Sequence, residues 1–157
     1  MNVMLKADTP LYLGIDGGGS KCRVVIVSAD QHVLGEGLSG PANPLRGMKI
    51  ATDSILAATQ QALTCAGLPF NDMSRLIAGA GLAGVNIPQY YQQVKDWQHP
   101  FKAMHLTSDL HIACVGAHQG QDGAVIIVEA TIHHLGLRKS TQILTQQEMD
   151  NEVFVSA

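Results

Sequence analysis

The chain has few of the features that mark a nucleic-acid-binding, membrane or secreted protein. Its 157 residues carry a formal net charge of −3 and contain no basic block, so nucleic-acid binding has no electrostatic support. No apolar run approaches the ~20 residues that span a bilayer. The first ten residues include a lysine and an aspartate and form no apolar secretory segment. We therefore expect no nucleic-acid partner, no membrane partner and a cytoplasmic location.

Cysteine is scarce as well. Cys22, Cys65 and Cys114 lie far apart and form no C-x-x-C pair, which predicts free thiols in a reducing compartment. Apolar residues nevertheless make up 46% of the chain, which is typical of a globular domain with a sizeable core. The expected protein is therefore a folded domain without disulfide bonds.

What the chain does contain is a glycine triplet between two apolar runs. In order, the segment consists of Leu11–Ile15, Asp16, Gly17, Gly18, Gly19, Ser20, Lys21 and Val24–Val27. Strand, glycine turn and strand form a hairpin, whose glycines would reach positive φ and expose N–H groups to an anion. A P-loop or a dinucleotide fold would instead need a helix directly after its glycines. The hairpin predicts a site for metal-bound polyphosphate, and a plain tight turn is the structural alternative.

The remaining pattern predicts an α/β fold. The expected strands are 11–15, 23–28, 32–37, 76–80, 103–107 and 124–128, and the expected helices are 48–66, 88–97 and 109–118. The order β-β-β-α-β-α-β-α-β indicates a mixed five-stranded sheet in which an antiparallel meander precedes parallel strands. Three loops, at the glycine turn, Gly81–Gly84 and Ser108-Asp109, then fall at the carboxyl ends of strands, where ligands bind in such sheets.

The composition changes after residue 128. Fifteen of the 16 glycines precede residue 129, and the apolar residues beyond it show no convincing period. This change predicts three parts, which are an N-terminal extension over 1–10, a domain over 11–128 and an atypical tail over 129–157.

Five segments together resemble the N-terminal domain of the BadF/BadG/BcrA/BcrD-type ATPase family, and within it the N-acetylglucosamine kinases and bacterial glucosamine kinases. They are Gly14–Lys21, Pro41–Pro44, Ala78–Gly84, Thr107–His111 and Asp122–Val128. The resemblance covers about residues 10–128. It implies an actin-like (ribonuclease H-like) ATPase domain of a kinase. The implied reaction transfers a phosphoryl group from ATP, with Mg²⁺, to the 6-hydroxyl of glucosamine or N-acetylglucosamine.

The resemblance also implies residue roles on the nucleotide side. Gly17, Gly18, Gly19, Ser20 and Lys21 would hold the β- and γ-phosphates. The Asp16 carboxylate would lie near the magnesium ion and hold it through water. For Lys21, the structural alternative is a solvated surface charge.

On the sugar side, the resemblance assigns Asn43, Gly81 and Gly84 to the substrate, and Asp109 to the role of general base on the 6-hydroxyl. A general base is typically worth ~10²–10⁴-fold in rate. Each polar residue has a structural alternative. Asp109 would simply be an acidic residue at a helix start, and Asn43 a turn residue.

The chain departs from the family after Val128. The family continues there with a second phosphate loop, Gly-Thr-Gly-Ser, and with a second domain, whereas this chain has Glu129-Ala130-Thr131-Ile132. We therefore expect a truncated or frameshifted N-terminal domain with the second domain missing. It should be inactive alone, because closure of two domains completes such sites. An open half-cleft would expose apolar surface, which favours a homodimer.

Two other functions remain open on the sequence. An activator-type ATPase of the same family would drive electrons from an iron–sulfur cluster, and it needs cysteines grouped at a subunit interface. A non-catalytic nucleotide- or sugar-binding remnant would keep the fold without turnover. The ungrouped cysteines and the Asn43 loop favour the kinase.

Overall fold

The computed structural model describes residues 9–118, 124–133 and 136–145. The chain divides into two compact units, residues 1–109 and residues 110–157. The first unit contains five strands and two α-helices: β1 (Leu11–Gly17), β2 (Cys22–Ser28), β3 (Val33–Ser39), α1 (Met48–Cys65), β4 (Leu76–Leu82), α2 (Pro88–Lys95) and β5 (Ala103–Ser108). Two short 3-10 helices, η1 (Pro44–Arg46) and η2 (Phe70–Arg75), precede α1 and β4.

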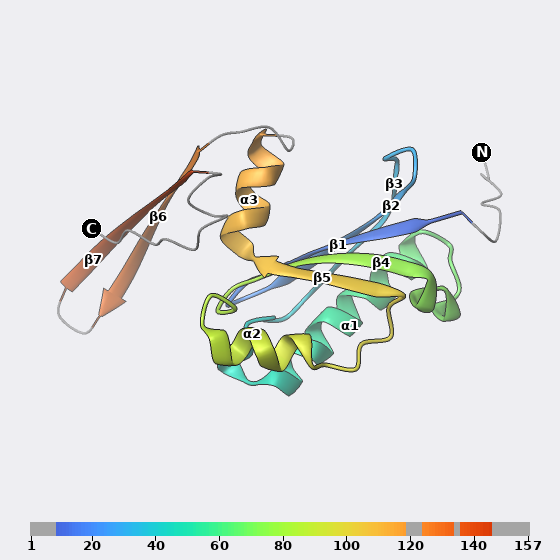
Figure 1. The fold of residues 1–157 in the computed structure, drawn as a ribbon, viewed down its shortest axis with the longest axis horizontal. Helices are drawn as coiled ribbons and strands as arrows, with labels where there is room; N and C mark the ends of the chain where they lie inside the picture. Colours follow the sequence, from blue (N-terminus) through green and yellow to red (C-terminus); the bar gives the residue numbers. More distant parts are fainter. Residues whose placement is uncertain (1–8, 119–123, 134–135, 146–157) are drawn as a thin grey trace. The chain divides into compact units, whose positions relative to one another are not determined.

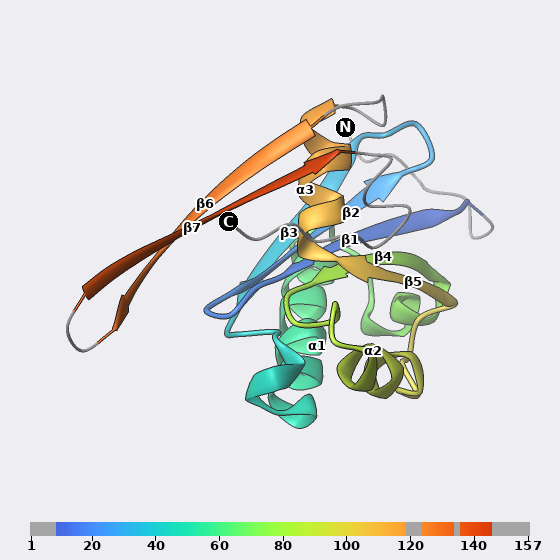
Figure 2. The ribbon, with the colours of Figure 1, turned by 60° about the vertical axis from the view of Figure 1, so that its left-hand side comes forward.

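The five strands of the first unit form one mixed sheet with the order β3-β2-β1-β4-β5. The pairs β1–β2 and β2–β3 are antiparallel, whereas β1–β4 and β4–β5 are parallel. Both α1 and α2 lie against the same face of this sheet (Figures 1 and 2). The predicted mixed five-stranded sheet is confirmed.

The core lies between this sheet face and the two helices. Burial alternates along β1, where Leu11, Leu13 and Ile15 are buried and the residues between them are exposed. Burying a side chain of this size stabilises the fold by roughly 1.5–3 kcal/mol. A stripe of buried small and aliphatic residues on α1, which includes Ile55 and Ala58, packs against them. The opposite face of β1 therefore carries the polar side chain of Asp16.

Helix α1 approaches β3 closely because two strand residues lack side chains. A Cβ atom on Gly35 would overlap the carbonyl oxygen of Ala62, and one on Gly37 would overlap the carbonyl oxygen of Ala58. These positions therefore permit backbone-to-backbone packing that no other residue allows. The contact positions α1 and the loop before it relative to the sheet edge.

The second unit contains most of α3 (Asp109–His118) and a hairpin of β6 (Ala124–His133) with β7 (Gly136–Thr145). These two strands form an antiparallel two-stranded sheet. The strand expected over 124–128 thus pairs with β7 rather than with the five-stranded sheet. No period in the sequence predicts β7.

Several predicted features lie outside the described residues. These are most of the N-terminal extension, the Asp122-Gly123 start of one family-like segment, and residues 146–157 of the tail. Within the described part of the chain, no helix combines the length and apolar character needed to cross a bilayer.

Candidate active site

The glycine hairpin connects β1 to β2 through a four-residue turn. Gly17 pairs with Cys22 at the end of the ladder, and the Gly18 N–H donates to the Lys21 carbonyl oxygen at 2.9 Å. None of the three glycines of the triplet has a positive φ, so that part of the prediction is wrong. A four-residue turn reverses the chain without the left-handed conformation that a two-residue turn requires.

The three glycines instead differ in the space around them. A Cβ atom on Gly17 would overlap the Leu82 side chain and lie 2.9 Å from the Ala42 Cβ. At Gly19 the same atom would meet nothing within 4 Å. The backbone N–H groups of Gly19 and Ser20 find no hydrogen-bond partner among the described residues. The tip is therefore open and offers donors to an anion.

Two further loops are tied to this hairpin through backbone atoms. The Gly18 carbonyl oxygen accepts from the Ala42 N–H at 3.0 Å, and the Gly17 carbonyl oxygen accepts from the Ala83 N–H at 2.8 Å. Sequence reasoning missed Ala42 and Ala83, because an alanine that contributes only its backbone leaves no signal in the residue pattern. These bonds hold the hairpin, the loop after β3 and the loop after β4 together.

The second and third loops also contact each other through Asn43 and Gly84. The Asn43 Oδ1 accepts from the Leu45 N–H at 2.9 Å and thereby caps η1. Gly84 has a φ of 84°, and a Cβ atom there would lie 2.5 Å from Asn43 Oδ1 and overlap Leu45. Asn43 therefore acts as a turn residue through its amide oxygen, and its amide nitrogen forms no hydrogen bond among the described residues.

Gly81 lies in a strand and not in the loop that the sequence predicts. Strand β4 continues through Leu82, so the loop begins at Ala83. Gly81 is buried and is the register partner of Asp16 on β1 and of Thr107 on β5. Gly81 therefore lies on β4, between Asp16 on β1 and Thr107 on β5.

The register places Asp109 at the same sheet edge as the hairpin. Gly17, Leu82 and Ser108 are register partners on β1, β4 and β5, and Asp109 follows Ser108 as the first residue of α3. Two strand spacings separate Gly17 from Ser108, which is about 10 Å. Asp109 is partly buried. Its position at a helix start favours the ionised carboxylate.

Asp16 offers a carboxylate, which is the kind of side-chain ligand that nucleotide-bound magnesium takes. The side chain is exposed on β1, one residue before the hairpin. Among the described residues, no three His, Cys, Asp or Glu side chains converge into a cage that would hold a metal alone. Magnesium usually takes one or two carboxylates together with substrate phosphates and water. A single carboxylate beside an open, donor-rich turn fits that requirement, and Lys21 is an exposed positive charge in the same turn.

The two cysteines whose side chains the structure describes, Cys22 and Cys65, supply no reactive group to this site. The pKa of the Cys22 thiol is raised to about 11, chiefly by burial and secondly by the nearby Asp16 charge, while a hydrogen bond with Ser39 acts in the opposite direction. Cys22 therefore stays protonated at neutral pH. Cys22 and Cys65 are free, as predicted, and the side chain of Cys114 lies outside the described residues.

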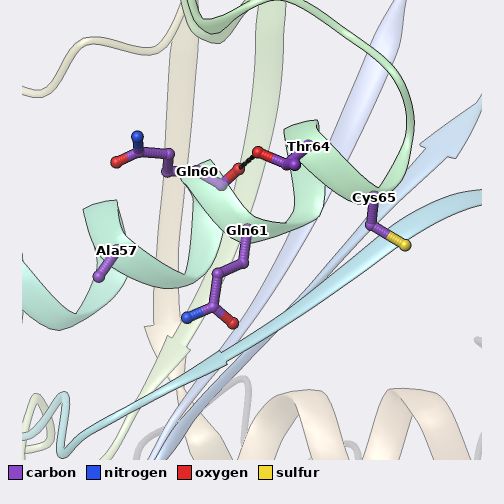
Figure 3. A pocket seen from close by; sticks show the side chains of 5 residues that line it. All are labelled: Ala57, Gln60, Gln61, Thr64 and Cys65. Carbon is purple, nitrogen blue, oxygen red and sulfur yellow. Dashed lines mark hydrogen bonds between the residues drawn. The ribbon is translucent and has the colours of Figure 1, made fainter.

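A separate hollow of about 550 Å³ lies on the exposed side of α1. Its lining comes from one helix: Ala57, Gln60, Gln61, Thr64 and Cys65 (Figure 3). Two of the polar groups are engaged within the protein. The Thr64 hydroxyl donates to the Gln60 carbonyl oxygen, and the Gln61 Oε1 accepts from the Leu38 N–H. None of the predicted site residues lines this hollow.

Comparison with known proteins identifies the family of the chain. The model of the BadF/BadG/BcrA/BcrD ATPase family matches residues 13–148. The chain belongs to this family. The match begins within β1 and extends past Val128, where the recognised motifs end, to residue 148.

Two relatives narrow the likeness within the family. Over 116 residues the chain is 37% identical to the glucosamine kinase GspK of Vibrio cholerae, which covers 74% of this chain and 40% of that protein. A solved structure from Chromobacterium violaceum, assigned as an N-acetylglucosamine kinase, superposes with a TM-score of 0.75 at 23% identity. That superposition covers 94% of this chain and 48% of the other, and it shows a shared fold. These matches thus cover less than half the length of either protein.

Proposed function

We propose that this chain is the N-terminal part of an ATP-dependent amino-sugar kinase. The observation that supports the proposal is the grouping of three glycine-bearing loops and Asp109 at one edge of the sheet. The Gly17 and Gly18 carbonyl oxygens tie the loops together, and Asn43 contacts Gly84. The 37% identity to a glucosamine kinase supports an amino sugar as the acceptor.

In the proposed reaction, the γ-phosphoryl group of ATP passes to the 6-hydroxyl of glucosamine or N-acetylglucosamine. Phosphoryl transfer requires mainly positioning and charge stabilisation, with one group that accepts the proton of the alcohol. The open tip at Gly19, Ser20 and Lys21 would hold the β- and γ-phosphates through N–H groups and a positive charge. Asp16 would hold magnesium through water, and the ion would neutralise the charge of the phosphates.

On the acceptor side, Asp109 would take the proton from the sugar hydroxyl. Asn43 would donate its amide N–H to another hydroxyl, since its oxygen already accepts from the Leu45 N–H. The backbone at Gly81 and Gly84 would line the sugar. The aligned 116 residues cover only 40% of the Vibrio cholerae kinase, so we expect a polypeptide limited to these 157 residues to bind ligands weakly and to turn over negligibly.

The test uses the 157-residue chain for binding and a chimera for turnover. Calorimetry on the chain should detect Mg²⁺-ATP and an amino sugar. In the chimera, this chain replaces the matching segment of the Vibrio cholerae kinase, and sugar-dependent release of ADP is measured. The Asp109→Asn chimera should lose ~10²–10⁴-fold in rate and still bind ATP.

The controls separate folding from chemistry. Thermal melting must show that both chimeras fold, and Asp96→Asn, an exposed carboxylate at the end of α2, should leave turnover unchanged. ATP hydrolysis by the chain without any sugar would contradict the kinase and favour an activator-type ATPase. Full turnover in the Asp109→Asn chimera would show that Asp109 is not the base.

A further inference from the structure

Asp16 shares its face of the sheet with an arginine. Asp16 and Arg23 are direct register partners across the antiparallel β1–β2 pair, and both side chains are exposed. Side chains at such directly opposed positions have Cβ atoms roughly 4.5–5.5 Å apart, within easy reach of an ion pair. A bond to Arg23 would take up the carboxylate that the proposed magnesium site needs.

The arginine forms its ion pair with a different residue. Its Nη2 donates to the Oε2 of Glu36 at 2.9 Å, and within the described residues this is the ion pair that Arg23 makes. Glu36 lies on β3 opposite Val25, so it is the diagonal and more distant neighbour of Arg23. The guanidinium is thus turned toward β3 and away from the strand that carries Asp16.

The Arg23–Glu36 pair borders a hollow beside the hairpin. The hollow, of about 420 Å³, is lined by Lys21, Arg23, Glu36, Gly37, Leu38 and Gln61. The Arg23 and Glu36 side chains are 58% and 49% exposed, so their ion pair contributes little to the stability of the fold. An ion pair that contributes so little to stability, and that lies beside the turn proposed to bind phosphate, suggests a role other than stability.

We propose that Glu36 is a positioning residue, which holds Arg23 away from Asp16 and thereby leaves the Asp16 carboxylate available to a metal-bound nucleotide. The inference rests on the proposed function, because it assumes that Asp16 serves the metal. Removing the Glu36 charge would release Arg23 to its direct partner Asp16. If Arg23 were removed as well, no guanidinium would compete with the metal-bound nucleotide for the Asp16 carboxylate.

The test measures how much a metal ion strengthens ATP binding. ATP is titrated into the 157-residue chain with and without Mn²⁺, and the two dissociation constants are measured by calorimetry. The ratio is the dissociation constant without Mn²⁺ divided by the constant with Mn²⁺, so a higher ratio means that the metal strengthens ATP binding more. It reports metal binding at the site separately from the general attraction of a positive surface for ATP. We expect Glu36→Gln to lower this ratio about two- to fivefold, the range of an exposed ion pair.

The second variant and the control make the result specific. The double variant Arg23→Gln/Glu36→Gln should restore the wild-type ratio, which a structural role for Glu36 alone would not do. Asp30→Asn makes the same change of charge in the turn after β2, at the other end of that strand from the hairpin, and should leave the ratio unchanged. Thermal melting of each variant confirms folding.

Each possible result tests either the inference about Glu36 or the proposed function. A ratio in Glu36→Gln that is unchanged or higher than wild type would overturn the inference and leave the proposed function standing. Failure of the double variant to restore the ratio would overturn it as well. If Mn²⁺ does not strengthen ATP binding to the wild-type chain, the proposed nucleotide site fails, and the inference fails with it.

Discussion

Glycine has opposite consequences at the β3 edge and at the tip of the hairpin. At Gly37 the space that a side chain would occupy is filled by the backbone of α1, at the Ala58 carbonyl. At Gly19 the same space is empty to 4 Å. One glycine is thus required by packing inside the protein, while the other leaves room for something from outside. The structure around each glycine, and not the residue type, separates a folding position from a candidate binding position.

The largest effect should follow from filling the packed position. Gly37→Ala places a methyl group against the Ala58 carbonyl, and a backbone atom cannot move away without displacing α1. We expect a loss of more than about 3 kcal/mol in the free energy of unfolding, measured in urea. Gly79→Ala is the matched control, since Gly79 also lies in a strand but has nothing within 4 Å of its added Cβ. Equal stability of the two variants would break the comparison.

The hairpin offers the same contrast within three residues. Gly19→Ala should leave the unfolding free energy unchanged and weaken ATP binding about tenfold, because the methyl group enters the space proposed for phosphate. Gly17→Ala should instead cost about 1–3 kcal/mol of stability, because its Cβ overlaps Leu82 and crowds Ala42. Calorimetry with ATP and urea unfolding measure the two quantities. Wild-type ATP affinity in Gly19→Ala would show that the open tip is not a binding surface.

The smallest effect separates the two roles of Asn43. Asn43→Asp keeps an oxygen that accepts from the Leu45 N–H but removes the amide donor. Stability should therefore hold, while affinity for the uncharged N-acetylglucosamine falls about three- to tenfold. Asn43→Ala removes both groups and should cost about 1 kcal/mol of stability in addition. A sugar affinity in Asn43→Asp equal to wild type would reduce Asn43 to a turn residue.

Local patterns predicted most of the first unit. The apolar run Leu11–Ile15 and the β-branched run Val24–Val27 indicate strands, and both appear as β1 and β2 with ends extended by a few residues. The apolar stripe of the first long helix also predicts its extent closely, since α1 covers Met48–Cys65. These signals work because they are local. Residues two positions apart share a face of a strand, and residues three or four positions apart share a face of a helix.

The candidate site was less predictable. Its residues were proposed from a motif likeness, but the reasons for their positions come from distant parts of the chain. The sequence suggests a left-handed conformation for the hairpin glycines, and this expectation is wrong, whereas Gly84 does have a positive φ and lies against Asn43. The hydrogen bond from the Ala42 N–H to the Gly18 carbonyl oxygen joins backbone atoms, which are the same in every residue type and so leave no signal in the sequence.

By itself, the sequence determined the order of strands and helices in the first unit, the apolar stripe of α1, and membership of the BadF/BadG/BcrA/BcrD ATPase family. Only the tertiary structure decided that Arg23 pairs with Glu36 rather than with its direct neighbour Asp16, and that the Asn43 amide oxygen accepts from the Leu45 N–H. Secondary structure follows from neighbours along the chain, which the sequence displays. The choice among partners follows from distances across strands and loops, which exist only once the chain has folded.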